Sequence, residues 1–444
     1  MTGAPWKPAL LRGGCFVAAG AIGARLFQAL GWFLLARMLA PADVGALTVA
    51  AVFVNALALL PGLGLGTALL ARREDPRPLA RSALTVALLG GAVLVGVAAG
   101  VGELVGRSRG EEVGRIVAVL GGSLLFQGAA SVAGALLDRS LRFERRALAD
   151  VAGGVVFVLV AVGSAAAGAR SLAPALGLVA SAAVTAMVAC CGARLLPTLR
   201  PDFAALRASA RVGLLVLATA LLQWLFVSAD VWIVERRFGR EAVGCYGIAL
   251  QLALLPATTI GLFVGRLALP AIAHARAVGG TASVGFVRAV RIALLLATTA
   301  TVVLGVAARP LVETLYGDHF TGATRLVRPL AIYGLARVLG GLAGPALLAT
   351  GRARVALLLV LLQDVVAIPV AWLLPAELGA RGTAVTFAAA TVVAGVIALR
   401  LGLRELHASE RPAGPEPAAS AASPAAAASE APLPAGPIGE GGLA

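Results

Sequence analysis

Three charged residues occur where the sequence is otherwise apolar. Arg25, Arg337 and Asp364 each stand midway through a long run rich in Ala, Val, Leu and Gly. A guanidinium group presents paired hydrogen-bond donors that match phosphate oxygens, and a carboxylate shielded from water can bind a cation or a proton. These residue types therefore predict anion binding by the two arginines and ion coupling by Asp364.

Polar neighbours extend the predicted substrate-binding set to Arg25, Gln28, Asn55 and Arg337. Gln28 lies three residues after Arg25, so the two side chains share one face of a helix, and Asn55 is in the middle of a separate apolar run. One alternative is a structural ion pair between Arg337 and Asp364 on neighbouring helices. The other is an Arg25 that pairs elsewhere or extends its long side chain to the membrane surface.

Asp230 is the second candidate for ion coupling. Asp364 is the first candidate because it is deeper in its apolar run. Transporters commonly couple to an ion through a buried carboxylate that titrates or binds a cation, H⁺ or Na⁺. Asp230 stands nearer to the end of its run. Contact with interfacial water or with Arg236 is therefore the alternative interpretation for Asp230.

The scarcity of other reactive residues argues against an enzyme. The chain has three histidines and four cysteines, and neither set has the spacing of a metal site or a catalytic triad. The sequence also lacks the GxxxxGK[ST] pattern of a nucleotide-binding loop. We therefore predict no catalytic residue, no metal and no cofactor.

Helices that cross a membrane must carry the charged residues. Of the 444 residues, 59% are hydrophobic and 13% are charged, and the mean hydropathy is +0.93, which excludes a water-soluble fold. A charge near the centre of a bilayer costs about 2.5 to 3.5 kcal/mol, so such a residue faces a cavity or a partner. The apolar runs predict twelve spans, at residues 13–36, 43–70, 82–105, 116–137, 148–168, 172–192, 211–234, 243–269, 288–308, 326–350, 354–374 and 382–403.

A repeated motif divides these spans into two groups of six. Residues 37–47 read RMLAPADVGAL and residues 236–246, which follow 199 positions later, read RRFGREAVGCY, with a Val-Gly pair in register. An even number of spans per repeat makes both halves cross the membrane in the same sense. The predicted fold is an all-α integral membrane protein with about twelve transmembrane helices in two six-helix bundles, residues 1–205 and 206–405, around a central cleft.

The basic residues predict the orientation. Lys and Arg number 37 against 22 Asp and Glu, which gives a net charge of +15. With the N-terminus in the cytoplasm, 22 basic residues fall in inside segments and 12 in outside segments, so both termini are predicted to be cytoplasmic. This role in topology explains the positive charge without a nucleic acid partner. Residues 406–444, rich in Pro, Ala, Ser and Gly, are predicted to form a disordered cytoplasmic tail.

Four segments together carry a family resemblance. They are the motif at residues 37–47, the GLGLG run at 62–66, LLDRSLRFERRA at 136–147 and ADVWIVERRFGREAVGCYGIALQLALLP at 229–256. In their order and spacing they resemble the polysaccharide exporter and O-antigen flippase family, most closely its colanic-acid-exporter branch. That family is part of a superfamily that includes multidrug and toxin exporters and lipid II flippases. The resemblance extends over nearly all of residues 9–405, and Asp230 stands where the branch often has an aspartate.

The resemblance implies a transporter, not an enzyme. Such a protein flips a polyprenyl-pyrophosphate-linked oligosaccharide, the repeat unit of an exopolysaccharide or lipopolysaccharide, across the bacterial inner membrane by alternating access. The implied partners are this lipid-linked oligosaccharide, membrane lipid, a coupling cation and glycan-assembly proteins. Two alternatives stay open. A multidrug exporter of the same fold would favour acidic residues because its usual cargo is cationic, and a membrane glycan polymerase or ligase would need a larger outer loop than residues 309–325.

Overall fold

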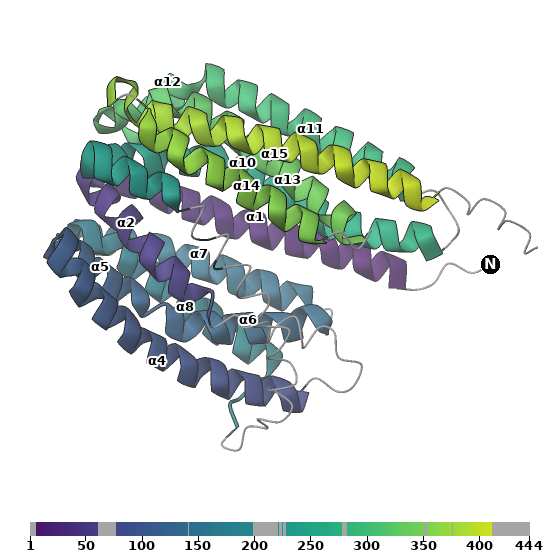
Figure 1. Ribbon diagram of the computed structural model, residues 1–444. Coiled ribbons are helices and arrows are strands. Elements are labelled where there is room, and N and C mark those ends of the chain that lie inside the picture. The colour runs from purple at the N-terminus through teal and green to yellow at the C-terminus, as the bar shows by residue number, and fades with distance from the viewer. Residues whose placement is uncertain are drawn as a thin grey trace, which may run out of the picture.

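The computed structural model is a long bundle of α-helices (Figure 1). It describes residues 6–60, 77–140, 142–198, 221, 224, 228–277, 282–349, 353–374 and 376–410. The helices of the N-terminal group are α1 (Trp6–Met38), α2 (Pro41–Ala58), α4 (Arg77–Arg109), α5 (Glu111–Gly121), α6 (Leu124–Arg139), α7 (Phe143–Ala166) and α8 (Ala173–Ala193). Those of the C-terminal group are α10 (Ala229–Ala277), α11 (Ala282–Val306), α12 (Ala308–Tyr316), α13 (Thr321–Ala349), α14 (Ala353–Leu373) and α15 (Gly379–Glu410). Three short 3-10 helices lie at Arg170–Leu172, Asp318–Phe320 and Ala376–Leu378.

The helices have the length and composition of membrane spans. Within the described residues, eight are long and apolar enough to cross a membrane, or nine with the bent pair Val290–Val306 and Ala308–Tyr316, which turns by 74°. The predicted all-α integral membrane fold is confirmed, and the chain is a multi-pass membrane protein. Every predicted span overlaps a helix; residues 229–234 of the seventh, 211–234, lie in α10, and most of its other residues lie outside the described part of the chain.

The structure adds a turn inside one predicted span and contradicts one predicted loop. The fourth span, predicted at 116–137, is one span at Glu111–Arg139, and within it a turn at Gly122 and Ser123, whose N–H groups bond to carbonyls three residues earlier, separates α5 from α6. The loop predicted between residues 234 and 243 is part of α10, which continues through a kink at Gly239 (φ 82°). A glycine adopts this backbone conformation without steric cost, so one residue is enough to redirect the helix.

Residues outside the spans also differ from the prediction. The segment 309–325, predicted as a loop, contains α12 and the 3-10 helix Asp318–Phe320. The first residues of the predicted tail, 406–410, still belong to α15, while residues 411–444 lie outside the described part of the chain.

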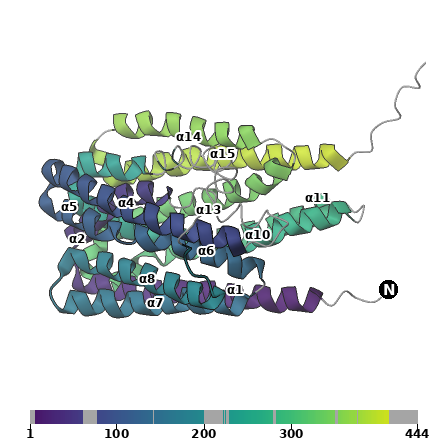
Figure 2. The ribbon, with the colours of Figure 1, turned by 90° about the horizontal axis from the view of Figure 1, so that it is seen from below.

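Small residues let neighbouring helices pack closely. Gly153 of α7 faces Thr185 and the carbonyl of Ser181 on α8, and a Cβ on Gly153 would lie 3.2 Å from that carbonyl oxygen. Gly31 of α1 likewise faces the ring of Phe157 on α7. In lipid, where burial of apolar surface gives little drive for helix association, such close approach supplies van der Waals contact. Figure 2 shows α1, α7 and α8 side by side as one layer.

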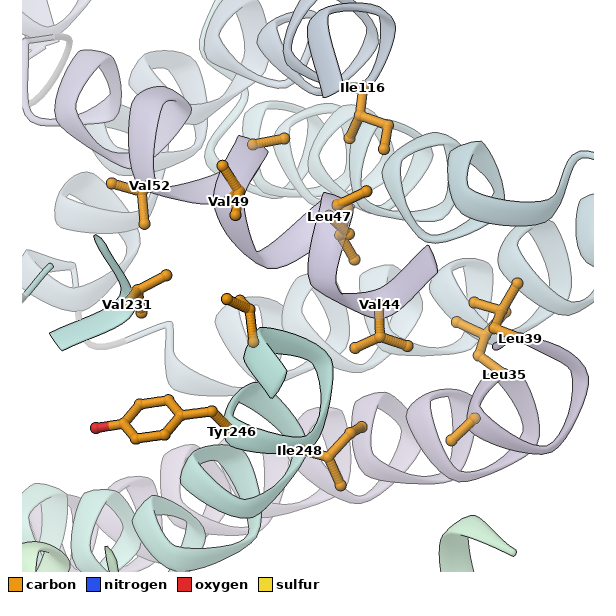
Figure 3. Close-up of a cluster of buried hydrophobic side chains, with 14 of the residues drawn as sticks. Leu35, Leu39, Val44, Leu47, Val49, Val52, Ile116, Val231, Tyr246 and Ile248 are labelled. Atoms are coloured by element: carbon orange, nitrogen blue, oxygen red, sulfur yellow. The ribbon is translucent and has the colours of Figure 1, made fainter. Parts of the chain in front are cut away.

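The two groups meet where α2 packs against α10 (Figure 3). Val44 and Leu47 of α2 are buried in one cluster with Tyr246 and Ile248 of α10, and α1 and α5 add further apolar side chains. This cluster joins the N-terminal and C-terminal groups through ordinary apolar packing. Division of the chain at residues 205 and 206 stays a prediction, because these two residues lie outside the described part.

Candidate functional site

Arg25 connects the two helix groups. Its guanidinium, on α1, donates to the hydroxyl of Thr258 at 2.8 Å and to that of Thr259 at 3.4 Å, both on α10. Arg25 precedes the end of α1 at Met38 by 13 residues, which places it about 20 Å along the helix at 1.5 Å per residue. The arginine is therefore deep in the bundle, is half-buried and points toward the opposite group rather than into lipid.

The other polar residues of the N-terminal group have different environments. Gln28, one turn further along α1, is half-buried, and Asn55 on α2 is exposed. They lie on α1 and α2, which contact helices of the C-terminal group. The contacts of the described part do not test their predicted role in binding.

Asp230 is buried at the start of α10 with only 2% of its surface exposed. The hydroxyl of Tyr246 donates to its Oδ2 at 2.8 Å, and the backbone N–H of Val231 donates to its Oδ1 at 2.7 Å. Both partners belong to α10 itself. The alternative that places Asp230 in interfacial water does not fit this burial.

Asp364 is also buried, at 4% exposure, on α14. The side-chain amide of Gln363 donates to Asp364 Oδ1 at 3.3 Å and to the hydroxyl of Thr391 on α15 at 2.9 Å. The Thr391 hydroxyl in turn donates to the carbonyl of Phe387 at 2.7 Å. Asp364 is thus one end of a short chain of polar groups that joins α14 to α15.

Arg337 of α13 completes the cluster. Its charge acts on Asp230, on Asp364 and on the hydroxyl of Tyr333, one helical turn earlier on α13. Among the described residues, no ion pair with an N–O distance of 4.0 Å or less joins Arg337 to Asp364, so these two residues do not form the structural ion pair that was the alternative. The arginine is exposed while both carboxylates are buried, which leaves its guanidinium accessible to another anion.

The structure therefore separates the predicted residues into two sets. Arg25 acts at the contact between groups, and Asp230, Asp364 and Arg337 form one polar cluster inside the C-terminal group. Buried carboxylates with hydroxyl groups beside them can hold a hard monovalent cation or accept a proton.

Sequence reasoning missed several members of these sets, namely Tyr246, Tyr333, Thr391, Thr258 and Thr259. A signal for the tyrosines was present, since the chain has three tyrosines and a tyrosine in a membrane span needs a partner for its hydroxyl.

Comparison with known sequences gives one family. The family described as "Polysaccharide biosynthesis protein" matches residues 34–325. The amylovoran biosynthesis protein AmsL of Erwinia amylovora is 27% identical over 159 residues, 36% of this chain and 41% of that protein. The teichuronic acid biosynthesis protein TuaB of Bacillus subtilis (strain 168) is 28% identical over 144 residues, 32% of this chain and 30% of that protein. The chain thus matches less than half the length of either relative.

Solved structures share the fold. An inward-facing multidrug resistance MATE family transporter of the MOP superfamily has a TM-score of 0.74 at 18% identity, over 88% of this chain and 96% of that one. An outward-facing MATE family transporter gives 0.67 at 18% identity, over 91% and 96%. The lipid II flippase MurJ in an inward closed conformation gives 0.68 at 13% identity, over 88% and 87%.

Proposed function

This chain belongs to the polysaccharide biosynthesis protein family, and from that premise we propose that it flips a lipid-linked oligosaccharide across the membrane. The cargo is a polyprenyl-pyrophosphate-linked repeat unit of a polysaccharide. The two helix groups rock about their contact so that a polar site opens first to one face and then to the other. The observation that carries the proposal is the guanidinium of Arg25, deep in the bundle at the contact between the groups.

The chemistry of Arg25 and Arg337 suits a pyrophosphate. A pyrophosphate diester is a compact anion, and each guanidinium offers paired donors to its oxygens. The hydroxyls of Thr258 and Thr259 accept hydrogen bonds from the Arg25 guanidinium and so orient it. Gln28 and Asn55 are the proposed neutral contacts to the same cargo.

The resting arrangement is proposed to be inward-facing. The higher TM-score to the inward-facing MATE family transporter, 0.74 against 0.67 for the outward-facing one, supports this assignment. The proposed location is the bacterial inner membrane with both termini in the cytoplasm, beside the glycan-assembly proteins that supply the cargo. In that orientation, the end of the bundle where α1 passes into α2 is the outer end.

Reconstitution tests the substrate assignment. The purified protein is placed in liposomes with a fluorescent polyprenyl-pyrophosphate oligosaccharide, and the fraction of label accessible to an external quencher is followed over time. Arg25→Gln and Arg337→Gln should each slow flipping strongly at normal protein levels, whereas Arg115→Gln, a change of an exposed arginine whose partner is the exposed Glu111, should not. Wild-type rates in both test variants would remove the basis of the proposal.

Ion coupling is proposed to use Asp364, with Asp230 in the same cluster. Both carboxylates are buried and are influenced by the same arginine, so a cation bound there would change the charge balance around Arg337. Flipping in liposomes with an imposed Na⁺ or H⁺ gradient should depend on that gradient, and Asp364→Asn should remove the dependence. Gradient-driven flipping that survives Asp364→Asn and Asp230→Asn would refute the coupling role.

Multidrug export is the second candidate, because the two buried carboxylates of the C-terminal group would suit a cationic compound. The same liposomes distinguish the two functions. A flippase moves the anionic lipid-linked glycan and leaves an organic cation such as ethidium in place, whereas a drug exporter does the reverse.

A further inference from the structure

The two copies of the repeated Val-Gly pair lie against each other. At Gly45 of α2 and Gly244 of α10, a Cβ atom added to either residue would come within 3.0 Å of backbone atoms on the opposite helix. The Cβ on Gly45 would meet the carbonyl of Arg240, and the Cβ on Gly244 would meet the carbonyl of Pro41. Only a residue without Cβ fits at these two positions. These four residues are called the glycine contact below.

The glycine contact follows the register of the sequence repeat. Gly244 comes 199 residues after Gly45, and Arg240 comes 199 residues after Pro41. The contact is therefore reciprocal: Gly45 touches Arg240, and its repeat equivalent Gly244 touches Pro41, which is the repeat equivalent of Arg240. Reciprocal contact of this kind defines a two-fold axis between subunits, and here it defines a pseudo-two-fold axis between the halves of one chain.

Polar contacts between the groups surround the glycine contact. They all lie at the end of the bundle where α1 passes into α2, and Figure 1 shows α2, α5 and α12 at that end. The guanidinium of Arg37 donates to the carbonyl of Thr314, that of Arg240 donates to the carbonyl of Arg109 and lies 3.6 Å from Glu112, and that of Arg109 pairs with Glu235.

We propose that the glycine contact closes the transport path at the outer face and breaks when the two groups rock apart. The proposal rests on the proposed function for the direction of the outer face. Its physical basis is that, at the two glycines, backbone meets backbone on the pseudo-two-fold axis with no Cβ between the helices. When the groups rock apart, the apolar cluster that α2 and α10 share opens as well, and the surrounding arginines and carboxylates take up water at the membrane surface.

A disulfide across the contact provides the first test. A Cβ built on Gly247 lies 3.6 Å from the Cβ of Thr48, within the range of about 3.5 to 4.5 Å that a disulfide requires. Thr48→Cys with Gly247→Cys, in a chain whose native cysteines are replaced by serine, should cross-link on oxidation. Flipping should then stop and return when the disulfide is reduced.

A second disulfide serves as the matched control. A Cβ on Gly322 of α13 lies 3.9 Å from the Cβ of the native Cys245 of α10, so Gly322→Cys, in a chain that keeps Cys245 and has its other native cysteines replaced by serine, joins two helices of the same group. This cross-link should leave flipping intact. Failure of the Thr48 and Gly247 pair to cross-link, or continued flipping after it has cross-linked, would overturn the proposal.

Alanine substitution provides a readout that does not depend on flipping. With Thr48→Cys as the reporter, an impermeant maleimide added from outside should react faster in Gly244→Ala, because the added Cβ forces the helices apart. Gly96→Ala on α4 is the control, since nothing lies within 4 Å of a Cβ there. An unchanged rate in Gly244→Ala would overturn the closure. If the cysteine-free parent does not flip the glycan, the proposed function fails, and the labelling rates still decide whether the contact opens.

Discussion

The contact of Arg25 with Thr258 separates a binding role of this arginine from a structural one. Thr258→Val keeps the shape of the side chain and removes the hydroxyl that accepts the 2.8 Å bond from Arg25. Adding Thr259→Val also removes the weaker 3.4 Å partner. The guanidinium keeps its charge and its place on α1, so it still binds the pyrophosphate if that is its task.

The expected shift follows from the strength of this bond. Side-chain hydrogen bonds between membrane helices average about 0.6 kcal/mol and reach about 1.7 kcal/mol. Bonds that involve a charged group are worth about 1.5 to 3 kcal/mol, so about 1 to 2 kcal/mol is expected here. At about 1.4 kcal/mol per factor of ten, the double valine variant should lower the population of the observed arrangement roughly 5- to 30-fold relative to the alternative state.

Two measurements on the same samples distinguish a binding role of Arg25 from a structural one. Distances between spin labels on the outer ends of α2 and α10 report the population of each state, and the liposome assay reports flipping. Flipping should stay within a few-fold of wild type in the double valine variant and be lost in Arg25→Gln. Thr301→Val is the control, because its hydroxyl bonds only to carbonyls of the C-terminal group, at Ala297 and Ala331. If the double valine variant is as inactive as Arg25→Gln, the arginine is a structural link and the binding role is refuted.

Two further predictions concern stability in detergent. Phe157→Ala should lower the free energy of unfolding by about 3 to 5 kcal/mol, because the ring is fully buried against α1. The control Phe27→Ala changes an exposed ring and should lower it far less. Equal thermal denaturation of the two variants would contradict this prediction. Tyr246→Phe removes the hydroxyl that donates to Asp230 and should lower the free energy of unfolding by about 1.5 to 3 kcal/mol. Tyr316→Phe, the control at another buried tyrosine, should change it little. An unaltered melting temperature in Tyr246→Phe would show that Asp230 does not need this hydroxyl.

The sequence predicts the helices of this fold well because the bilayer imposes their length. An apolar run of roughly 20 residues has no other stable form in lipid, so the runs around Arg25 and Arg337 were identified from composition alone. Breaks in the helices were not predictable in the same way. The kink at Gly239 depends on one backbone angle, and the turn at Gly122 keeps its hydrogen bonds within four residues, so neither interrupts the apolar pattern.

The candidate site was predictable only in part. Depth within an apolar run identified Arg25 and Asp364, since a charge there is costly and must have a purpose. One partner of Arg25, Thr258, is 233 residues away along the chain, and the hydroxyl that donates to Asp230 belongs to Tyr246. Such pairs depend on how the helices pack, so they cannot be predicted from the spacing of residues along the chain.

The repeat gives more information once the contact is known. From the sequence, the paired Val-Gly motif indicated only that the chain was duplicated. The reciprocal approach of Gly45 and Gly244 indicates why a glycine is required in both copies, because either one with a Cβ would collide with the carbonyl of the other helix. A duplicated motif is thus also the place where the two halves touch.

The cross-group contacts set the free energy that the cargo has to supply. At the outer end the groups meet through the glycine contact, through the apolar cluster of α2 and α10 and through ion pairs, of which the partly exposed pair of Arg240 and Glu112 is worth about 1 kcal/mol or less. Reversal of a two-state population from 1:99 to 99:1 needs about 5.5 kcal/mol. Several charge-assisted hydrogen bonds from Arg25 and Arg337 to a pyrophosphate, at about 1.5 to 3 kcal/mol each, reach that value. The binding of an anionic cargo therefore supplies a free energy of the size needed to reverse the populations of the closed and open states.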